Sequence, residues 1–489
     1  MHSATVADRL CLFICQQKFQ ESLMNTSSAS LASMRTIGFR LLDRRAQLIA
    51  FLIIIGTILS AIIPPFQSPD EFDHVKRAYL LSKGQFILVS PPNANSGGYI
   101  DSGLLSYMDA FTHLPHEGEH KVDREDIVKA RQSTWTKTTN FSAAPGTGYY
   151  FPLVYLPQAV GLAVGEALDL TVDKSYRLAR LLALTLSIAL IFLASRIYPT
   201  NLLTLALLAM PMTIFQMVSA SLDGTTTALS ILCISLFMRA MDRDLDTPRW
   251  MAWLLPVSLL LLVTSRTHLL PLVGIPLVLF IARRRTVDLA LFAVLTILSL
   301  AWLYIAMRYT IDLRVTRTQT TGYMIGYYLA RPGAFFKLIW ASLMDTELRL
   351  YYQQTFVGVL GWLDLKFQSW FYQLSILFCV LMGALSVHWK TIRQDWQVRG
   401  WLLGFAALSS LLVFFLLLVT WTPHPATVVL GVQGRYFLIP FILIAYALKG
   451  QDDALAPRRK LLALPVFYLY MLLLSIVMPQ ELIYRYFAH

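Results

Sequence analysis

Long apolar stretches recur along most of this chain, separated by short polar segments. A helix needs about 20 mostly apolar residues to cross about 30 Å of hydrocarbon. About eleven stretches meet or approach this length: residues 46–63, 177–195, 202–218, 225–241, 251–265, 269–282, 287–307, 371–387, 401–421, 436–448 and 461–478. The pattern predicts an all-α polytopic membrane protein with about eleven transmembrane helices.

One further apolar stretch, residues 151–168, is interrupted by two prolines, two glycines and Glu166. Proline removes a helix hydrogen bond, and a glutamate is costly to place in hydrocarbon. We predict a juxtamembrane or re-entrant helix here rather than a crossing. The spacing of Gly161 and Gly165 is typical of close helix packing.

The composition supports a bilayer environment. Hydrophobic residues make up 56% of the 489 positions and charged residues only 14%, whereas soluble domains carry about 25% charged residues. The mean hydropathy of +0.56 agrees with this. These values exclude a soluble globular, a disordered or a coiled-coil protein, and the four cysteines provide no disulfide framework. A net charge of +12 alone would suit a nucleic-acid partner. The positions of the basic residues along the chain indicate another role.

Lysine and arginine cluster in alternate loops between the apolar stretches, and short loops rich in these residues stay in the cytoplasm. Eleven crossings put the N-terminus and the triplet Arg283–Arg285 inside, whereas an extra crossing at 151–168 would put the triplet outside. The other residues that mark the inner face are Arg35, Arg40, Arg44, Arg45, Arg196, Arg239, Arg243, Arg249, Lys390, Arg393, Arg399, Lys449, Arg458, Arg459 and Lys460. The charge therefore sets orientation, and no nucleic-acid partner is expected.

This topology gives three parts along the chain. Residues 1–45 are expected to form a cytoplasmic, disordered tail, with Met24 and Met34 as alternative start positions. Residues 46–478 are expected to form the transmembrane domain, and residues 479–489 a C-terminal tail outside.

Two sizeable segments, residues 64–176 and 309–370, lie outside the membrane in this topology. The cytoplasmic loops are short and contain no glycine-rich motif that could hold a nucleotide phosphate. This excludes ATP hydrolysis or nucleotide-sugar binding on the inner side. Any chemistry is expected at the outer membrane–water boundary, where a lipid-borne substrate can arrive.

The first outer segment opens with the most informative stretch, residues 64–74. It follows a crossing directly, so Asp70, Glu71, Asp73 and His74 are expected at headgroup level. A carboxylate that loses hydration has a raised pKa, which favours use as a base or metal ligand. The alternative is a capped helix start, with Ser68 as N-cap and Pro69 at the first helical position. The two interpretations are compatible.

Two shorter motifs add an acid and an arginine at the same face. Residues 219–224 form a short outer turn with Asp223, which is either functional or an N-cap for a helix starting at Thr225. Residues 431–436 place Arg435 at the outer end of a crossing. An arginine there can hold a phosphate bidentately, or it can reach out to lipid headgroups.

Weaker groups of polar residues lie on the same side. Residues 113–120 hold three histidines, but Pro115 interrupts helical ligand spacing, so a solvated loop is favoured over a metal site. Arg266 and His268 at an outer turn are either an anion contact or an interfacial anchor. A basic and aromatic set in the second outer segment suits an anionic or sugar ligand, although such side chains are common at interfaces. This set is Arg308, Arg314, Arg317, Tyr323, Tyr327 and Tyr328.

These motifs together resemble a bacterial family of predicted membrane proteins whose first outer loop opens with a proline-proline-aspartate-glutamate-x-x-histidine motif. Here the run is Ser68-Pro69-Asp70-Glu71-x-x-His74, with serine in place of the first proline. Pro211-Met212-x-x-x-Gln216 with Ser219-x-Ser221-x-Asp223 matches the second motif of that family, and Val432-Gln433-Gly434-Arg435-Tyr436 matches the third. The resemblance covers roughly residues 46–478, in matching order and spacing.

That family is similar to the GT-C superfamily of polytopic glycosyltransferases, which includes the protein mannosyltransferases and the aminoarabinose transferase of lipid A. The resemblance implies a GT-C-like fold with juxtamembrane helices in the large first outer loop. It also implies an acid in that loop and another in the next, positions that Asp70 or Glu71 and Asp223 occupy. Such enzymes move a sugar from polyprenyl phosphate to an acceptor, here a cell-envelope glycan or lipid, on the outer face of the bacterial cytoplasmic (inner) membrane.

The expected roles follow from these positions. Asp70 is the expected general base, with Glu71 as substitute, because neighbours on a helix point about 100° apart and only one can face the site. No second carboxylate is an evident nucleophile, so single displacement with inversion is expected.

The remaining site residues are expected to bind and orient. Asp223, Asp73 and His74 would position the acceptor, and Asp70 with Asp223 would hold a divalent metal such as Mg²⁺ or Mn²⁺ if one is used. The expected phosphate ligands are Arg435, Arg266 and His268.

The alternative from another functional class is a lipid-linked-glycan transporter (flippase) or a polymerase. Transporters place charges and broken helices near the bilayer midplane, often within inverted repeats. Here the charged motifs lie at the outer boundary, and the sequence shows no repeat. The pattern favours the transferase.

Overall fold

The computed structural model describes residues 44–242, 247–315, 319–448 and 457–488. The predicted N-terminal tail lies, up to residue 43, outside these residues. The chain divides into two compact units, Met1–Ile53 and Ile54–His489. Of the first unit, the described part is the N-terminal portion of helix α2 (Arg44–Ile62), and the paragraphs below concern the second unit.

Long apolar helices dominate the second unit, and the expected all-α, multi-span fold is confirmed. Among the residues that the structure describes, six helices are long and apolar enough to cross a bilayer: α7 (Val172–Ile197), α10 (Asp223–Met241), α13 (Thr286–Tyr309), α17 (Ser369–Ser386), α19 (Trp396–Thr420) and, over Leu462–Tyr486, α21 (Pro457–Tyr486). Shorter apolar helices lie at Gln47–Ile62, Arg249–Ser265, Thr267–Arg283, Pro332–Met344 and Gly434–Leu448. These helices overlap ten of the eleven expected crossings, and the total of eleven crossings stays a prediction.

The expected crossing at 202–218 is divided into two helices of seven residues each, α8 (Leu202–Leu208) and α9 (Pro211–Met217). Met210 has an extended backbone (φ −67°, ψ 140°) because the ring of Pro211 disfavours the helical conformation in the residue before it. Pro211 then starts α9, where its missing N–H leaves no helix hydrogen bond unmade.

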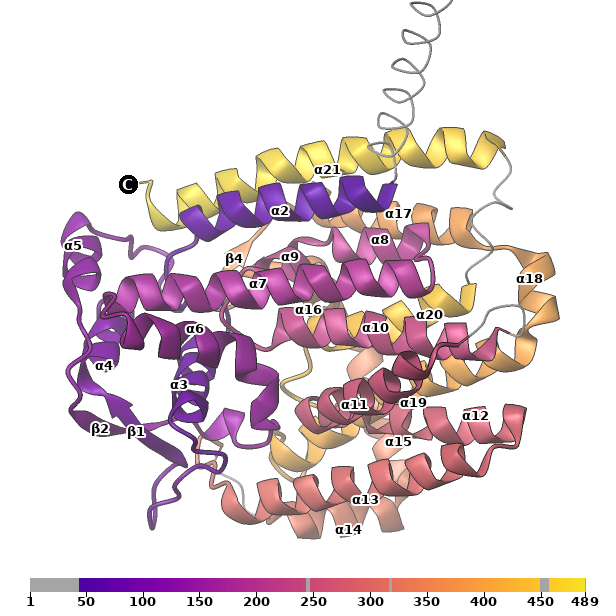
Figure 1. Cartoon of the computed structure of the whole chain (residues 1–489), viewed down its shortest axis with the longest axis horizontal. Helices are drawn as coiled ribbons and strands as arrows, with labels where there is room; N and C mark the ends of the chain where they lie inside the picture. The colour runs from indigo at the N-terminus through magenta and orange to yellow at the C-terminus, as the bar shows by residue number, and fades with distance from the viewer. Residues whose placement is uncertain (1–43, 243–246, 316–318, 449–456, 489) are drawn as a thin grey trace, which may run out of the picture. The chain divides into compact units, whose positions relative to one another are not determined.

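The stretch 151–168 forms a short 3₁₀ turn, η2 (Pro152–Tyr155), and helix α6 (Leu156–Ala167). Twelve residues are too few to cross a bilayer, which agrees with the prediction. A Cβ atom on Gly161 would lie 2.5 Å from Cα of Ala179, and one on Gly165 would collide with the side chain of Ser175. The two glycines thus let α6 pack closely on α7, antiparallel to its N-terminal half (Figure 1).

The first outer segment gathers at one end of the long helices, while α18 (Trp389–Gln394) lies at the other (Figure 1). It contains α3 (Glu71–Ser82), α4 (Ser102–Asp109), α5 (Arg124–Gln132) and the turn η1 (Pro145–Thr147). Strands β1 (Gly97–Asp101) and β2 (Thr139–Ala143) pair antiparallel, with Tyr99 opposite Phe141.

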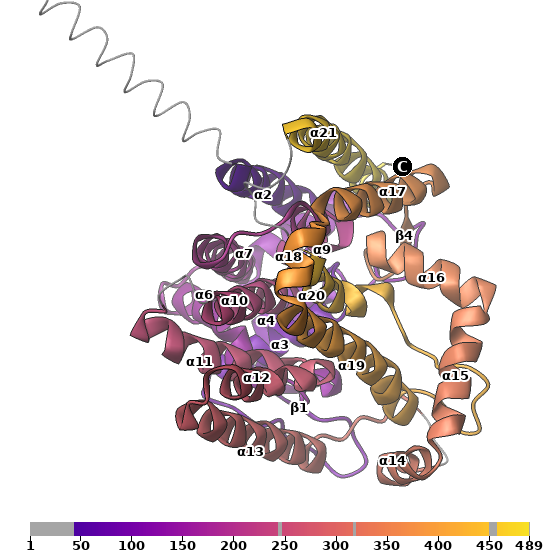
Figure 2. The same ribbon diagram turned by 90° about the vertical axis from the view of Figure 1, so that its right-hand side faces the viewer.

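The remaining helices and strands complete the second unit. They are α11 (Arg249–Ser265), η3 (Thr267–Gly274), α12 (Ile275–Arg283), α14 (Thr321–Ala330), α15 (Pro332–Met344), α16 (Thr346–Val357), the hairpin β3 (Val359–Leu360) and β4 (Leu365–Lys366), η4 (Gly434–Phe437) and α20 (Leu438–Leu448). In Figure 2 the long helices are foreshortened, and α14, α15 and α16 are seen along one side.

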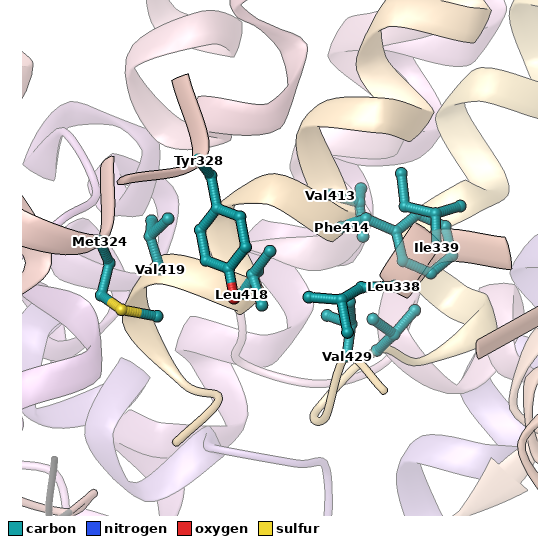
Figure 3. Close-up of a cluster of buried hydrophobic side chains, with 10 residues drawn as sticks. Met324, Tyr328, Leu338, Ile339, Val413, Phe414, Leu418, Val419 and Val429 are labelled. Carbon is teal, nitrogen blue, oxygen red and sulfur yellow. The ribbon is translucent and has the colours of Figure 1, made fainter. Parts of the chain in front are cut away.

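A buried apolar cluster joins the second outer segment to the chain that leads into η4 (Figure 3). Side chains from α14 and α15 pack there on the C-terminal half of α19 and on two valines before η4. The cluster consists of Met324, Tyr328, Leu338, Ile339, Val413, Phe414, Leu418, Val419, Val429 and Val432. It fixes the approach to Gly434 and Arg435.

The C-terminal residues differ from the expected outer tail. Helix α21 continues past Met478 to Tyr486. Near its end, Arg485 Nη2 donates to the carbonyl of Leu114 at 2.7 Å and pairs with Asp364 at 2.7 Å. Arg485 is buried, and these contacts satisfy its charge. They connect the last turns of α21 to the first outer segment, through Leu114, and to the second, through Asp364.

Candidate functional site

Asp70 is the N-cap of α3, two residues later than the expected N-cap, Ser68, so Pro69 precedes the helix. Its backbone is left-handed (φ 61°), as is that of Phe66 (φ 64°), so the chain turns twice before the helix can begin. The side chain of Asp70 makes no capping hydrogen bond, and half of it is exposed (50%). An aspartate tolerates this conformation better than most residues. Its carboxylate is therefore available for another use.

Glu71, the next residue, is fully buried and its carboxylate is fully occupied. Oε2 accepts from the backbone N–H of Ser68 at 3.0 Å. Oε1 accepts from the hydroxyl of Tyr176 at 2.8 Å and from the backbone N–H of Ala220 at 2.6 Å. Glu71 thus joins the first motif to α7 and to the turn of the second motif.

The second motif forms a hydrogen-bonded turn that begins α10. Asp223 is the first residue of that helix rather than its N-cap, and its backbone N–H donates to Ser221 Oγ at 3.3 Å. Gln158 of α6 donates to the carbonyl of Ser221 at 2.8 Å. The carboxylate of Asp223 forms an ion pair with Arg266, and both side chains are largely buried.

The third motif brings Arg435 to Asp70. The backbone N–H of Gly434 donates to Thr355 Oγ1 of α16 at 2.7 Å, and a Cβ on Gly434 would collide with the carbonyl of Tyr352. This close approach places Arg435, whose side chain is 7% exposed, with Nη2 4.0 Å from Oδ2 of Asp70. The structure does not show the alternative in which Arg435 reaches out to headgroups.

The guanidinium of Arg435 has spare hydrogen-bond donors. Its Nε and Nη1 atoms are buried and have no hydrogen-bond partner among the residues that the structure describes. A buried charged donor is costly to leave without a hydrogen-bond partner, and such donors are rare in folded proteins. The face beside Asp70 can therefore accept an anion.

His74 lies one turn further along α3 and is buried. Its Nδ1 lies 2.7 Å from the hydroxyl of Tyr155. The pKa of His74 is lowered to about 3, mainly by burial; Asp70 opposes this shift, and the positive charges of Arg266 and Arg435 add to it. His74 is therefore a neutral hydrogen-bonding group at physiological pH, and it shares one charged cluster with Asp70 and both arginines.

Three other residues were expected in the site: Asp73, Arg266 and His268. Asp73 pairs with Lys76 Nζ at 3.4 Å, and burial raises the pKa of Asp73. Arg266 lies over the ring of Tyr150, 5.5 Å from its centroid, beside the cluster. His268, half-buried in η3, makes no hydrogen bond or ion pair with these groups in the described chain.

The histidines of residues 113–120 and the basic residues of the second outer segment lie outside this cluster or at its edge. His113 pairs with Asp126 at 3.4 Å and His120 contacts the carbonyl of His113, in an exposed loop as expected. Arg314 forms a bidentate pair with Asp312. Arg317 lies outside the described residues.

The residues offered for a metal, Asp70 and Asp223, do not fit a divalent cation. Each lies beside an arginine, Arg435 and Arg266 respectively. A guanidinium paired with a carboxylate repels a second cation at that carboxylate. Within the described ranges there is also no group of three or more histidine, cysteine, aspartate or glutamate side chains that could hold a metal.

The structure adds residues that the motifs did not indicate. Arg180 of α7 donates to the carbonyls of Val218 at 2.7 Å and Ile63 at 3.2 Å, and so joins the first two motifs. A charge inside a predicted crossing was the available signal for this residue. Trp362, between β3 and β4, donates to the carbonyl of Phe66 at 2.8 Å, and no sequence pattern marks it.

Comparison with known proteins identifies the family. No curated protein matches the chain. Among solved structures, it is similar to ArnT from Cupriavidus metallidurans bound to undecaprenyl phosphate, at 13% identity and a TM-score of 0.40, over 90% of this chain and 74% of that one. The family model described as "Predicted membrane protein (DUF2142)" matches residues 48–445. This confirms the resemblance drawn from the three motifs, and the chain belongs to that family of predicted membrane proteins.

Proposed function

We propose that this protein is an integral-membrane glycosyltransferase that moves a sugar from a polyprenyl-phosphate donor to a cell-envelope glycan or lipid on the outer face of the bacterial cytoplasmic membrane. One observation carries the proposal: a half-exposed Asp70 carboxylate lies 4.0 Å from a buried Arg435 whose Nε and Nη1 are unpartnered. A base beside an anion-binding group is what transfer from a phosphate ester requires.

The proposed reaction is a single displacement. Asp70 takes the proton of the acceptor hydroxyl while the oxygen forms a bond to the anomeric carbon. The bond from that carbon to the phosphate oxygen breaks, and the phosphate leaves with the electron pair, its charge met by Arg435. Inversion follows, because Glu71 is fully hydrogen-bonded and Asp223 is ion-paired, so neither is free to attack the sugar.

The choice of Asp70 over Glu71 as the base follows from their surroundings. A base must reach the substrate and be free to accept a proton. Asp70 is half-exposed and makes no cap bond, whereas Glu71 is buried with three donors. Glu71 is therefore proposed as a structural bridge, not a substitute base.

A lipid-borne donor suits the location of the site. Asp70 starts α3 shortly after the apolar helix ending at Ile62, and Asp223 and Arg435 start apolar helices. The site thus lies where a polyprenyl phosphate would present its headgroup. The resemblance of the motifs to GT-C enzymes supports the same donor class.

Transfer from a radiolabelled polyprenyl-phosphate sugar by purified wild type and Asp70→Asn tests the proposal. We expect the rate to fall by about 10²–10⁴-fold, with an unchanged thermal midpoint, because asparagine also tolerates the left-handed backbone. Asp169→Asn is the matched control: Asp169 is also left-handed (φ 51°) and exposed, but lies outside the cluster. Equal rates for wild type and Asp70→Asn would exclude Asp70 as the base.

A further inference from the structure

We propose that Arg266 is a built-in counterion which takes the place of a divalent cation at Asp223, so that the site works without a metal ion. This inference rests on the proposed function, because it concerns the cofactor of that reaction. The observation behind it is a pattern of pairing among the acids of the cluster.

Apart from Glu71, each acid of the cluster has a basic side chain beside it. Asp223 pairs with Arg266, Asp73 with Lys76 at 3.4 Å, and Asp70 lies 4.0 Å from Arg435. A divalent cation bound to these carboxylates would lie near the positive side chains that already pair with them. Like charges at such distances repel strongly where water is scarce.

Arg266 is held firmly at Asp223. Its side chain is 11% exposed and that of Asp223 is 15% exposed, so the pair is enclosed rather than a loose surface pair. The guanidinium lies over the ring of Tyr150, which is itself part of the cluster. The backbone N–H of Arg266 donates to the carbonyl of Leu262 at 2.9 Å, which fixes the residue at the end of α11.

The pair also explains why Asp223 is fixed at this position. A carboxylate at the first residue of a helix is stabilised by the helix dipole, and an ion pair with arginine completes its neutralisation. Arg435 then supplies the positive charge that a metal would bring to the donor phosphate, and Arg266 takes the place of the metal at Asp223. Removing Arg266 should leave Asp223 able to attract an external cation weakly.

Titration of the purified full-length protein with Mn²⁺, read as loss of the free-ion electron paramagnetic resonance signal, tests this directly. We expect wild type to show no binding below about 10 mM, and Arg266→Gln to gain a site near 1 mM, a weak affinity typical of few ligands. Asp223→Asn in the Arg266→Gln background should remove that site. Arg266→Lys keeps a cation there and should bind no better than wild type.

Lys83→Gln is the control, because it makes the same charge change beside Glu166, in an exposed pair at 2.6 Å. It should bind Mn²⁺ no better than wild type. An equal gain in this control, or no gain in Arg266→Gln, would contradict the proposal. So would stoichiometric binding to wild type below about 0.1 mM that Asp223→Asn removes.

A chelation arm completes the test without any variant. Sugar transfer by wild type in excess EDTA should stay within about twofold of its rate with added Mg²⁺, and loss of activity that Mg²⁺ restores would overturn the inference. If no transfer occurs under any condition, the proposed function fails, while the Mn²⁺ titration still gives its answer.

Discussion

Asp70 and Glu71, the neighbouring acids at the start of α3, should differ in what their charge does for the stability of the protein. Asp70→Asn should leave the stability unchanged, whereas Glu71→Gln should lower it. Glu71→Gln replaces an acceptor of three hydrogen bonds by an amide that turns an N–H₂ group toward one of the donors. We expect the free energy of unfolding to fall by about 1–3 kcal/mol. Thermal unfolding in detergent measures this loss.

Glu166→Gln provides the comparison for Glu71→Gln, because Glu166 also has a basic partner, Lys83, but in an exposed pair. Its loss should cost less than about 1 kcal/mol. An unfolding midpoint for Glu71→Gln equal to that of Glu166→Gln would refute the bridging role of Glu71.

His74 gives a pH dependence of stability. Burial lowers its pKa from 6.5 to about 3, so the unfolded chain binds a proton at a higher pH than the folded protein does. The stability that comes from the neutral imidazole is fully present above pH 6.5 and declines as the pH falls toward 3. We expect a loss of about 1.4 kcal/mol per pH unit below pH 6.

Thermal midpoints between pH 7 and pH 4 for wild type and His74→Gln measure the contribution of His74. The decline should be less steep in His74→Gln, whose amide can still contact Tyr155. His113→Gln, in an exposed loop, should retain the steep decline. Parallel curves for wild type and His74→Gln would show that His74 is not the group responsible.

At the scale of single residues, the sequence could indicate the chemistry but not the contacts. Asp70, Asp223 and Arg435 stand out because polar residues at the ends of apolar stretches are few. Nothing local distinguishes Asp70 from Glu71, since their difference comes from Tyr176 and Ala220, more than 100 positions away. Trp362 is hidden for the same reason: its N–H reaches Phe66 across 296 positions.

Close packing of α6 on α7 gives a prediction at the scale of elements. A Cβ on Gly161 would lie 2.5 Å from Cα and 2.6 Å from N of Ala179, both backbone atoms that cannot move independently. Gly161→Ala should therefore separate the two helices and cost about 1–3 kcal/mol of unfolding free energy. Because η2 precedes α6 and carries Tyr155, sugar transfer should fall as well.

Gly326→Ala makes the same substitution on α14, where no atom lies within 4 Å of the new Cβ. Alanine favours helix over glycine by about 0.8–1 kcal/mol, so this variant should be as stable as wild type or more stable. Thermal midpoints of the two variants, measured side by side, decide the matter. A Gly161→Ala protein as stable as Gly326→Ala would mean that α6 does not depend on this close contact.

A helix could be predicted from the sequence where one local property, such as the length of an apolar stretch, determines it. Apolar length predicted the long apolar helices, and the prolines with Glu166 predicted an interrupted stretch at 151–168, where the twelve-residue α6 lies; that α6 does not cross stays a prediction. The division of 202–218 into α8 and α9 was not expected, although Pro211 was the signal for it. The helical end of α21 depends on Arg485 pairing with Asp364, a contact between distant segments that local pattern does not contain.

Orientation is the prediction that belongs to the whole molecule. The basic loops place the first outer segment and Arg285 on opposite faces, because the expected crossings between them are 177–195, 202–218, 225–241, 251–265 and 269–282, an odd number. A sixth crossing at 151–168 would bring them to the same face. One labelling experiment therefore tests both the orientation and the assignment of α6.

The experiment places one cysteine at a time in a chain whose own four cysteines are replaced by serine or alanine. Gly118→Cys, in open space within the first outer segment, should react with a membrane-impermeant maleimide in intact cells. Arg285→Cys, exposed before α13, should react only after the membrane is opened. Gly333→Cys, one crossing later, should again react in intact cells. Labelling of both Gly118→Cys and Arg285→Cys from outside would mean that 151–168 crosses, and reversed labelling would move the proposed site to the cytoplasmic face, where a lipid-borne outer-leaflet donor could not reach it.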